Sequence, residues 1–199
     1  MEPKIMEIAQ RIRGLREILE ISEEKMAELT DTTVEEYKKL ESGEHDFSFT
    51  FLYLCANVFG VDIIELLTGD KPRLSFYTVV RSGAGLPIKR NKSFTYQHMA
   101  YRMQNKLCEP FVVIAPYLEE SQDQEISTSR HKGQEFDFVL KGSLKVRLDD
   151  YIEVLGEGDA IFYDSSHKHG MIATGGQDCT FLAIVMGEHN DDTDREDNG

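Results

Sequence analysis

The sequence has no tryptophan, and only three cysteines among its 199 residues. Cys55, Cys108 and Cys179 lie far apart in apolar or strand-like surroundings, so neither a disulfide framework nor a cysteine-based zinc site is expected, and all three should be reduced core residues. Charged residues interrupt every apolar stretch well before the roughly 20 residues needed to cross a membrane. The N-terminus also lacks the apolar centre of a signal peptide. We therefore expect a cytoplasmic protein that does not associate with membranes.

Basic residues are scarce, with 22 Lys and Arg against 36 Asp and Glu, and the formal net charge is -14. This balance argues against indiscriminate binding to nucleic acid, which needs a local excess of positive charge. The acidity is uneven, because residues 1–70 hold 7 basic and 16 acidic side chains and residues 188–199 hold 1 and 6, whereas residues 71–187 are balanced at 14 each. The first domain and the tail are therefore acidic, and the middle of the chain is neutral.

Residues 1–70 have the spacing of apolar side chains that is typical of helices, which predicts five short helices and a first domain. Ser22 is a predicted N-cap, and Thr33 with Glu36 forms a capping box at the start of the third helix. Gly43 and Gly60 are predicted to end the third and fourth helices.

After residue 70 the pattern changes to short β-rich runs separated by turn residues, which predicts an antiparallel barrel over residues 71–187. Residues 188–199 are polar and acidic, and we expect a disordered tail. The fold class is therefore multidomain α and β, with a five-helix domain followed by a barrel. The predicted strands are Leu74–Arg81, Tyr96–Tyr101, Phe111–Pro116, Ile126–His131, Glu135–Leu140, Ser143–Leu148, Tyr151–Leu155, Ala160–Tyr163, Gly170–Ala173 and Thr180–Val185.

The order of helices in residues 11–69 resembles the lambda-repressor-like, Xre-type helix-turn-helix family of transcriptional regulators. The resemblance implies that the third helix, residues 33–41, enters the major groove of double-stranded operator DNA. Glu23 stands where the family usually has glutamine, and the DNA-facing surface carries further carboxylates, which phosphates repel. We expect binding that is weak, salt-sensitive and dependent on a homodimer. The predicted DNA contacts are Lys25, Thr33, Glu35, Glu36, Lys38, Lys39 and Ser42.

Two stretches of the β-rich half resemble the two motifs of the cupin superfamily, a family of double-stranded β-helix barrels. His131, Glu135 and Gly142 keep the spacing of the first motif, with Ser129 at the position of its first histidine. His169 keeps the last histidine of the second motif, in which Gly158 is also present and Asp164 and Ser166 replace the usual Pro and Gly.

His131, Glu135 and His169 form a two-histidine, one-carboxylate set, which suits Fe, Mn, Ni or Zn and leaves positions open for a ligand. An alternative is that both histidines hydrogen-bond an organic ligand or Glu135 itself. His167 is a weaker alternative ligand, since a histidine in a loop is usually solvated. The predicted small-molecule pocket consists of Tyr96, His98, Tyr101, Ser129, Tyr163 and Met171.

Three functions fit these observations. The favoured one is a transcriptional regulator whose cupin barrel senses a small-molecule effector, a metal ion or both. A metal-dependent cupin enzyme of the oxygenase or isomerase type, with a degenerate helical domain, is less favoured because no nucleophile constellation accompanies the metal set. The third is a protein-interaction adaptor that uses the acidic helical face.

Overall fold

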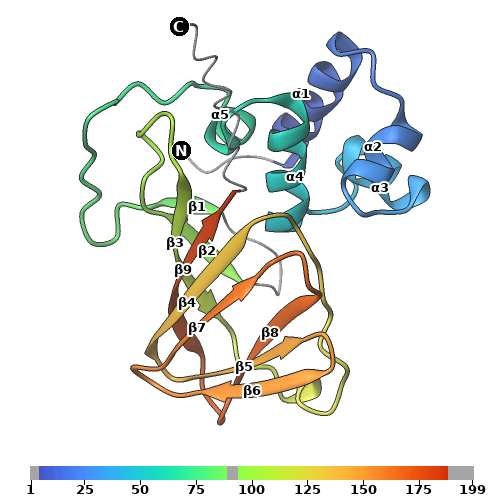
Figure 1. The fold of residues 1–199 in the computed structure, drawn as a ribbon. Helices are drawn as coiled ribbons and strands as arrows, with labels where there is room; N and C mark the ends of the chain where they lie inside the picture. Colours follow the sequence, from blue (N-terminus) through green and yellow to red (C-terminus); the bar gives the residue numbers. More distant parts are fainter. Residues whose placement is uncertain (1–4, 89–93, 188–199) are drawn as a thin grey trace, which may run out of the picture.

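A computed structural model describes residues 5–88 and 94–187 and shows a helical head followed by a β-barrel (Figure 1). The head is all α-helix, in agreement with the periodicity of its sequence. No helix in these two ranges has the length and apolar character that a membrane span requires. The head consists of α1 (Ile5–Ile18), α2 (Glu23–Leu29), α3 (Val34–Ser42), α4 (Phe49–Phe59) and α5 (Ile63–Thr68).

The helices of the head begin and end at residues with specific capping roles. The side chains of Ser22, Thr33 and Asp62 each accept a hydrogen bond from a backbone N–H in the first turn of the following helix. Gly43 and Gly60 adopt left-handed backbone conformations, with φ of 76° and 64°, at the ends of α3 and α4. Such caps satisfy backbone groups that have no partner inside the helix. The predicted starts of α2 and α3 and ends of α3 and α4 are confirmed.

The barrel is built from two antiparallel sheets, with strand orders β1-β2-β3-β9-β4-β7 and β6-β5-β8. Both sheets bury one face, as the alternation of buried and half-buried residues along β9 illustrates. The strands are β1 (Leu86–Ile88), β2 (Thr95–His98), β3 (Cys108–Ala115), β4 (Gln134–Lys141), β5 (Ser143–Leu148), β6 (Tyr151–Leu155), β7 (Ala160–Asp164), β8 (His169–Thr174) and β9 (Cys179–Met186).

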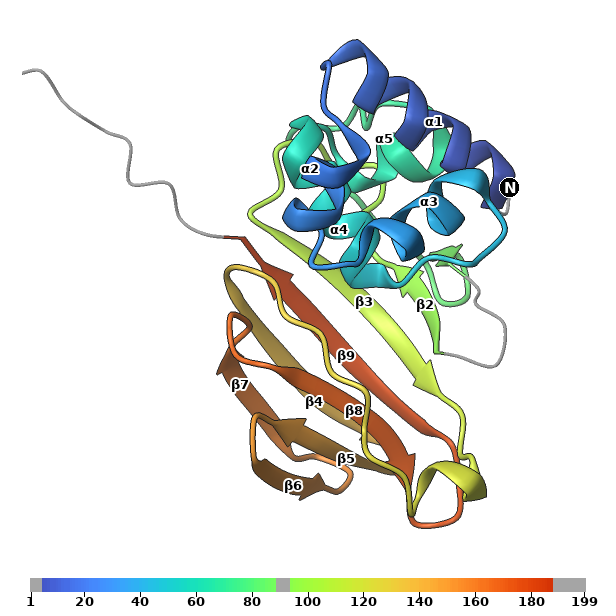
Figure 2. The same cartoon turned by 90° about the vertical axis from the view of Figure 1, so that its right-hand side faces the viewer.

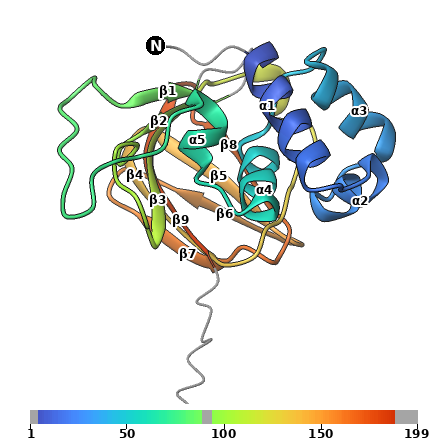
Figure 3. The ribbon, with the colours of Figure 1, turned by 90° about the horizontal axis from the view of Figure 1, so that it is seen from above.

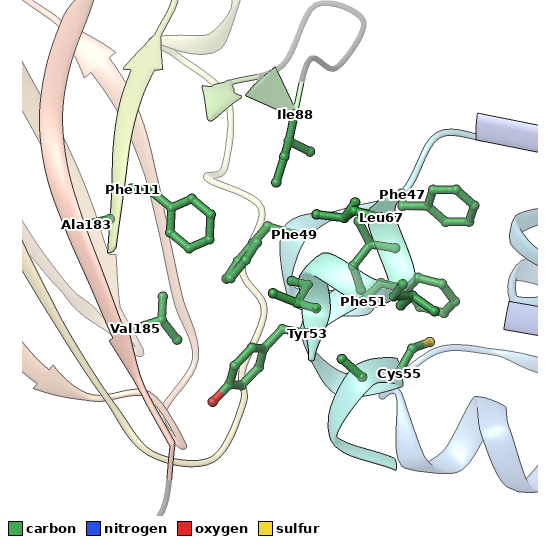
Figure 4. Packing of buried hydrophobic residues seen from close by; sticks show 14 of the residues in the cluster. Phe47, Phe49, Phe51, Tyr53, Cys55, Leu67, Ile88, Phe111, Ala183 and Val185 are labelled. Carbon is green, nitrogen blue, oxygen red and sulfur yellow. The ribbon is translucent and has the colours of Figure 1, made fainter. Parts of the chain in front are cut away.

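The head sits on one end of the barrel, and the two parts share a continuous hydrophobic core (Figures 2 and 3). The Phe49 ring at the start of α4 lies 4.7 Å from the ring of Phe111 in β3 and 5.7 Å from that of Tyr96 in β2, measured between centroids. Figure 4 shows Phe49 and Tyr53 directed toward the barrel strands. Because these side chains of α4 pack against barrel residues in a shared core, the head and the barrel are packed as one body.

The Lys106 ammonium adds a polar link between the two parts. Its side chain is only 4% exposed, and it pairs with Asp62 at the start of α5 and with Glu109 in β3. A buried ammonium is costly unless it is paired, so this arrangement favours a fixed relation between α5 and β3.

Two predicted strands are absent. Residues 74–81 make only an isolated bridge between Leu74 and Met103, and residues 126–131 make only a bridge between Ser129 and His169. Both runs are rich in β-forming residues, but a strand needs a neighbouring strand for its hydrogen bonds, which the local sequence does not reveal. The short β1 strand was not predicted. The domain boundary at residues 70 and 71 stays a prediction, and the predicted tail lies outside the described residues.

The cysteines are unpaired, as expected. Cys55 and Cys179 are buried in the core, whereas Cys108 is half-buried at the start of β3. Burial raises the pKa of the Cys179 thiol to about 11, so this thiol is protonated and unreactive near neutral pH.

Candidate functional site

His131, Glu135 and His169 converge at the end of the barrel that faces the head. Glu135 lies in β4, His131 precedes that strand, and His169 begins β8 in the other sheet. Two backbone hydrogen bonds of 2.9 Å between Ser129 and His169 hold the segment before β4 against β8. One ligand atom from each of the three side chains lies within 4.8 Å of the others, and all three residues are buried.

Backbone carbonyls orient both imidazole rings. The Nδ1 of His131 lies 3.2 Å from the carbonyl oxygen of Lys132, and the Nδ1 of His169 lies 2.9 Å from that of His167. A carbonyl oxygen only accepts, so each Nδ1 carries the proton and each Nε2 of a neutral ring has its lone pair free. These Nε2 atoms lie 3.3 Å and 3.8 Å from one Glu135 carboxylate oxygen.

This donor set fits a divalent metal ion. A metal-bound histidine usually donates its second N–H to a carbonyl or carboxylate, as both rings do here. Burial lowers the pKa of His169 below its ordinary value of 6.5, which favours the neutral, metal-binding form of the ring. The triad can therefore hold a metal ion through two imidazole nitrogens and one carboxylate.

A second acid lies beside the triad on the same face of β4. Asp137 is fully buried, and its Oδ2 accepts a hydrogen bond of 3.3 Å from the Tyr163 hydroxyl. Burial raises the pKa of Asp137 well above its ordinary value, and the nearby Glu135 carboxylate raises it further. Burial likewise raises the pKa of Tyr163, whose ring lies 5.2 Å from that of His169. Burial therefore favours the protonated, neutral forms of Asp137 and Tyr163, which lie next to the triad.

The triad opens onto a cavity of about 410 Å³ between the barrel and the head. This is within the range of small-molecule sites, roughly 300–1,000 Å³. Phe94, Phe111 and Phe181 provide apolar walls, and three residues at the start of α4 close the side toward the head. They are the N-cap Ser48 and the first two residues of α4, Phe49 and Thr50.

Three of the predicted pocket residues, Tyr96, Ser129 and Met171, line this cavity. Tyr163 is not among the residues that line this cavity, and its ring packs against that of His169. The structure places the other two elsewhere. His98 is buried against Phe111 and bonds the Glu109 carboxylate. Tyr101 lines a separate cavity between α1, α5 and β1. Alternation along β2 indicated that Tyr96 and His98 share a face, and both rings contact Phe111, but only Tyr96 lines the cavity.

The residues from the head were missed by sequence reasoning. Phe49 and Thr50 line the cavity, and the Tyr53 ring lies 5.4 Å from the His131 ring in an edge-to-face contact. Phe49 and Tyr53 fit the apolar pattern of a helix core, and Thr50 is an ordinary residue of a first turn, so nothing local distinguishes them as part of a site. The weaker ligand candidate, His167, is exposed and bonds Asp149 at 2.7 Å, outside the triad.

Comparisons with known proteins match the two parts separately. Residues 9–71 match the model of a helix-turn-helix domain family, and residues 118–185 match that of a cupin domain family. The chain joins a helix-turn-helix domain to a cupin domain. No curated protein sequence matches the chain.

Two solved structures illustrate what the chain is similar to. The crystal structure of an HTH_3 family transcriptional regulator from Vibrio cholerae has a TM-score of 0.66 and 20% identity, and the match covers 94% of this chain and 98% of that one. Hydroxypropylphosphonic acid epoxidase from S. wedmorenis has a TM-score of 0.48 and 21% identity, and the match covers 94% of this chain and all of that one. At 20% identity, the first match establishes a common fold.

In the helix-turn-helix domain, α3 corresponds to the helix that enters the major groove. Glu35, Lys38, Lys39 and Ser42 are exposed on it. Thr33 is the N-cap of this helix, with its hydroxyl accepting from the backbone N–H of Glu36.

Ion pairs neutralise part of the predicted DNA-binding surface. Lys38 pairs with Glu23 at 3.2 Å, and Lys25 pairs with Glu28 at 2.8 Å. The Glu36 carboxylate bonds His45 instead of closing the predicted capping box. Between residues 22 and 45 there are eight acidic and three basic side chains. The surface around α3 is therefore acidic. Lys25 and Lys38 would have to leave their carboxylate partners before they could contact DNA phosphates.

Proposed function

We propose that this chain is a DNA-binding transcriptional regulator whose cupin domain binds a divalent metal ion, a small molecule or both, and transmits that binding to its helix-turn-helix domain. One observation carries the proposal. Three consecutive residues of the segment that leads into the triad, Ser129, Arg130 and His131, each contact the helix-turn-helix domain.

The three contacts involve two parts of the helix-turn-helix domain, which are α4 and the turn between α2 and α3. The Ser129 and Thr50 hydroxyls lie 3.1 Å apart, and the His131 ring packs on Tyr53, so Ser129 and His131 both contact α4. Arg130 donates to both carboxylate oxygens of Asp31, at 3.1 Å and 3.2 Å, in the turn between α2 and α3. That turn directly precedes the helix expected to enter DNA.

This geometry supports coupling in a specific way. The exposed Arg130–Asp31 pair is weak in free energy, but it links the segment to the turn. The buried packing of Tyr53 against His131 is the stronger connection, because close-packed side chains transmit small displacements. A ligand that binds one arrangement of His131 more tightly shifts the equilibrium toward that arrangement, and α4 and the turn move with it. The size of this shift in free energy equals the difference between the ligand's binding free energies for the two arrangements. A bound divalent ion would supply the positive charge that draws both imidazoles and the carboxylate together.

The direct test is fluorescence anisotropy of the full-length protein with DNA from its own promoter at low salt. We expect saturable binding whose affinity changes when Mn²⁺ or Zn²⁺ replaces a chelator, and no metal response in Glu135→Gln. An absence of saturable binding would overturn the DNA-binding proposal. Binding that is identical with metal and with chelator, and unchanged by small-molecule candidates, would overturn the sensing proposal.

The acidic surface provides a second test of DNA binding. Replacing Glu35 and Glu36 with glutamine removes two negative charges from α3 and should strengthen DNA binding on the order of threefold to tenfold at low salt. Glu120→Gln, an exposed substitution in the cupin domain, is the matched control and should have much less effect. If the α3 variants still bind no DNA, an interaction with another protein becomes the better assignment for this face.

A metal-dependent enzyme is a second candidate, favoured by the apolar cavity of about 410 Å³ on which the triad opens. Such a cavity can hold a small organic substrate next to the open coordination positions. An oxygen-consumption and isomerisation screen of the metal-loaded protein distinguishes this candidate from the sensor. Turnover would favour the enzyme, and ligand-dependent DNA affinity without turnover would favour the sensor.

A further inference from the structure

The segment between α5 and β1 carries exposed apolar side chains that this chain does not cover. In residues 73–82, which we call the arm, the exposed fractions are 89% for Phe76, 68% for Tyr77 and 54% for Val79. Figure 1 shows this segment as a long loop on the side of the molecule. Its sequence has the β-forming residues of a strand, but its one β-bridge to another described segment is that of Leu74 with Met103. A segment of this composition is prone to pair with another strand.

The arm belongs to a strongly basic part of an acidic protein. Residues 71–108 contain eight Lys and Arg and no Asp or Glu. In the arm itself, the charges are those of Arg73 and Arg81, and neither guanidinium has an ion-pair partner in the described ranges. A partner for the arm should therefore present apolar side chains flanked by carboxylates.

The stretch from the turn before β6 to the end of β7 has these properties. Residues 149–164 contain six Asp and Glu and no Lys or Arg. Tyr151, Ile152 and Val154 of β6 are 76%, 51% and 59% exposed, and Phe162 of β7 is 55% exposed. Among the described strands, β6 pairs only with β5, so its other edge offers backbone groups without a strand partner there. An exposed apolar edge strand is a template for adding a strand.

The two surfaces do not meet within one molecule. The arm begins next to the head, whereas β6 lies at the end of the barrel that is farthest from the head (Figure 1). Across residues 5–88 and 94–187, no hydrogen bond or ion pair joins them. Complementary charge, matching apolar character and an open strand edge therefore point to contact between copies.

We infer that the arm of one copy lies along the free edge of β6 in a second copy, where the negative charge of Asp150, Glu153 and the neighbouring carboxylates attracts Arg73 and Arg81. Two such contacts related by a two-fold axis give each copy one arm and one acceptor edge, which closes the assembly as a homodimer. The inference is independent of DNA binding, although the dimer would also place two helix-turn-helix domains together.

Sedimentation velocity of the full-length protein tests the charge complementarity. We expect a dimer at micromolar concentrations that weakens with salt, and a dissociation constant raised on the order of tenfold or more by Arg73→Glu with Arg81→Glu. Adding Asp150→Lys and Glu153→Lys to that variant should restore most of the affinity. A monomeric wild type, an assembly larger than a dimer, or no restoration in the combined variant would overturn the inference.

Apolar contact and pairing are tested with substitutions at exposed positions. Phe76→Ser should weaken the dimer on the order of tenfold, whereas Leu107→Ser, a control at an 81% exposed leucine outside the arm, should not. Under mild oxidation, a mixture of Phe76→Cys and Val154→Cys proteins should form a disulfide-linked pair more readily than either variant alone. Rapid cross-linking of Phe76→Cys by itself would mean that arms pair with each other, and would refute the β6 edge as the acceptor.

Discussion

The packing of Phe49 between the helix-turn-helix and cupin domains gives a quantitative prediction. The Phe49 side chain is 8% exposed, and its ring contacts Phe111 and Tyr96 of the barrel. Phe49→Ala removes almost all of this buried area and leaves a cavity between the domains, which costs about 3–5 kcal/mol. For a chain of this size, the loss corresponds to a melting temperature lowered by roughly 6–20 °C. Denaturant titration and calorimetry measure both quantities.

Phe51→Ala is a matched control two residues along the same helix. Phe51 is 2% exposed, but its ring contacts lie within the head, with Tyr37 and Phe47. The two substitutions remove the same atoms, so their costs should be similar while their locations differ. Hydrogen exchange resolves the location.

Hydrogen exchange should become faster in α4 and also in β2 and β3 when Phe49 is truncated. Truncation of Phe51 should affect α3 and α4 and leave β3 protected. The reasoning is refuted if Phe49→Ala costs less than about 1 kcal/mol, or if exchange in β2 and β3 is the same as in the wild type. Either result would mean that the two domains do not depend on each other for stability.

Two further predictions concern buried charge. Arg16 makes a bidentate pair with Glu41 whose side chains are 13% and 6% exposed, so Glu41→Gln removes the buried carboxylate of this pair and should cost about 3 kcal/mol in denaturant titration. Glu17→Gln breaks an exposed pair and should change stability little; an equal loss in both variants would contradict the assignment. Burial lowers the pKa of His169 below 6.5, so the ring binds metal in its neutral form near pH 7. In calorimetric titration with Zn²⁺ or Mn²⁺, affinity should fall as acid protonates His169, with the midpoint of the fall below the ordinary imidazole value of 6.5. A midpoint above pH 7 would refute this account.

The elements that sequence reasoning predicted correctly are those with local signals. Helix caps such as Ser22 and Thr33 act within three residues of the backbone group that they satisfy, and the strands Ser143–Leu148 and Tyr151–Leu155 are bounded by turn residues. The residues of the arm show the limit of such signals. They have β-forming side chains, but strand formation needs a partner backbone, and in the part of the chain that the structure describes only the bridge at Leu74 supplies one.

The triad was predictable because motif spacing fixes which side chains point into a barrel, and the structure brings His131, Glu135 and His169 together as predicted. The pocket around them was predictable only in part. His98 shares its strand with Tyr96, but it packs on Phe111 and bonds Glu109 instead of lining the cavity.

The sequence by itself therefore determined the two folds, the order of their elements and the three candidate ligands, because helix capping, periodicity and motif spacing act over a few residues. The tertiary structure alone decided how the two domains meet. Thr50 and Ser129 are 79 positions apart in the chain and 3.1 Å apart in space. Tyr53 looks like any core residue of a helix until the barrel places His131 beside it. Contacts of this kind depend on the packing of whole domains, for which a single sequence contains no local pattern.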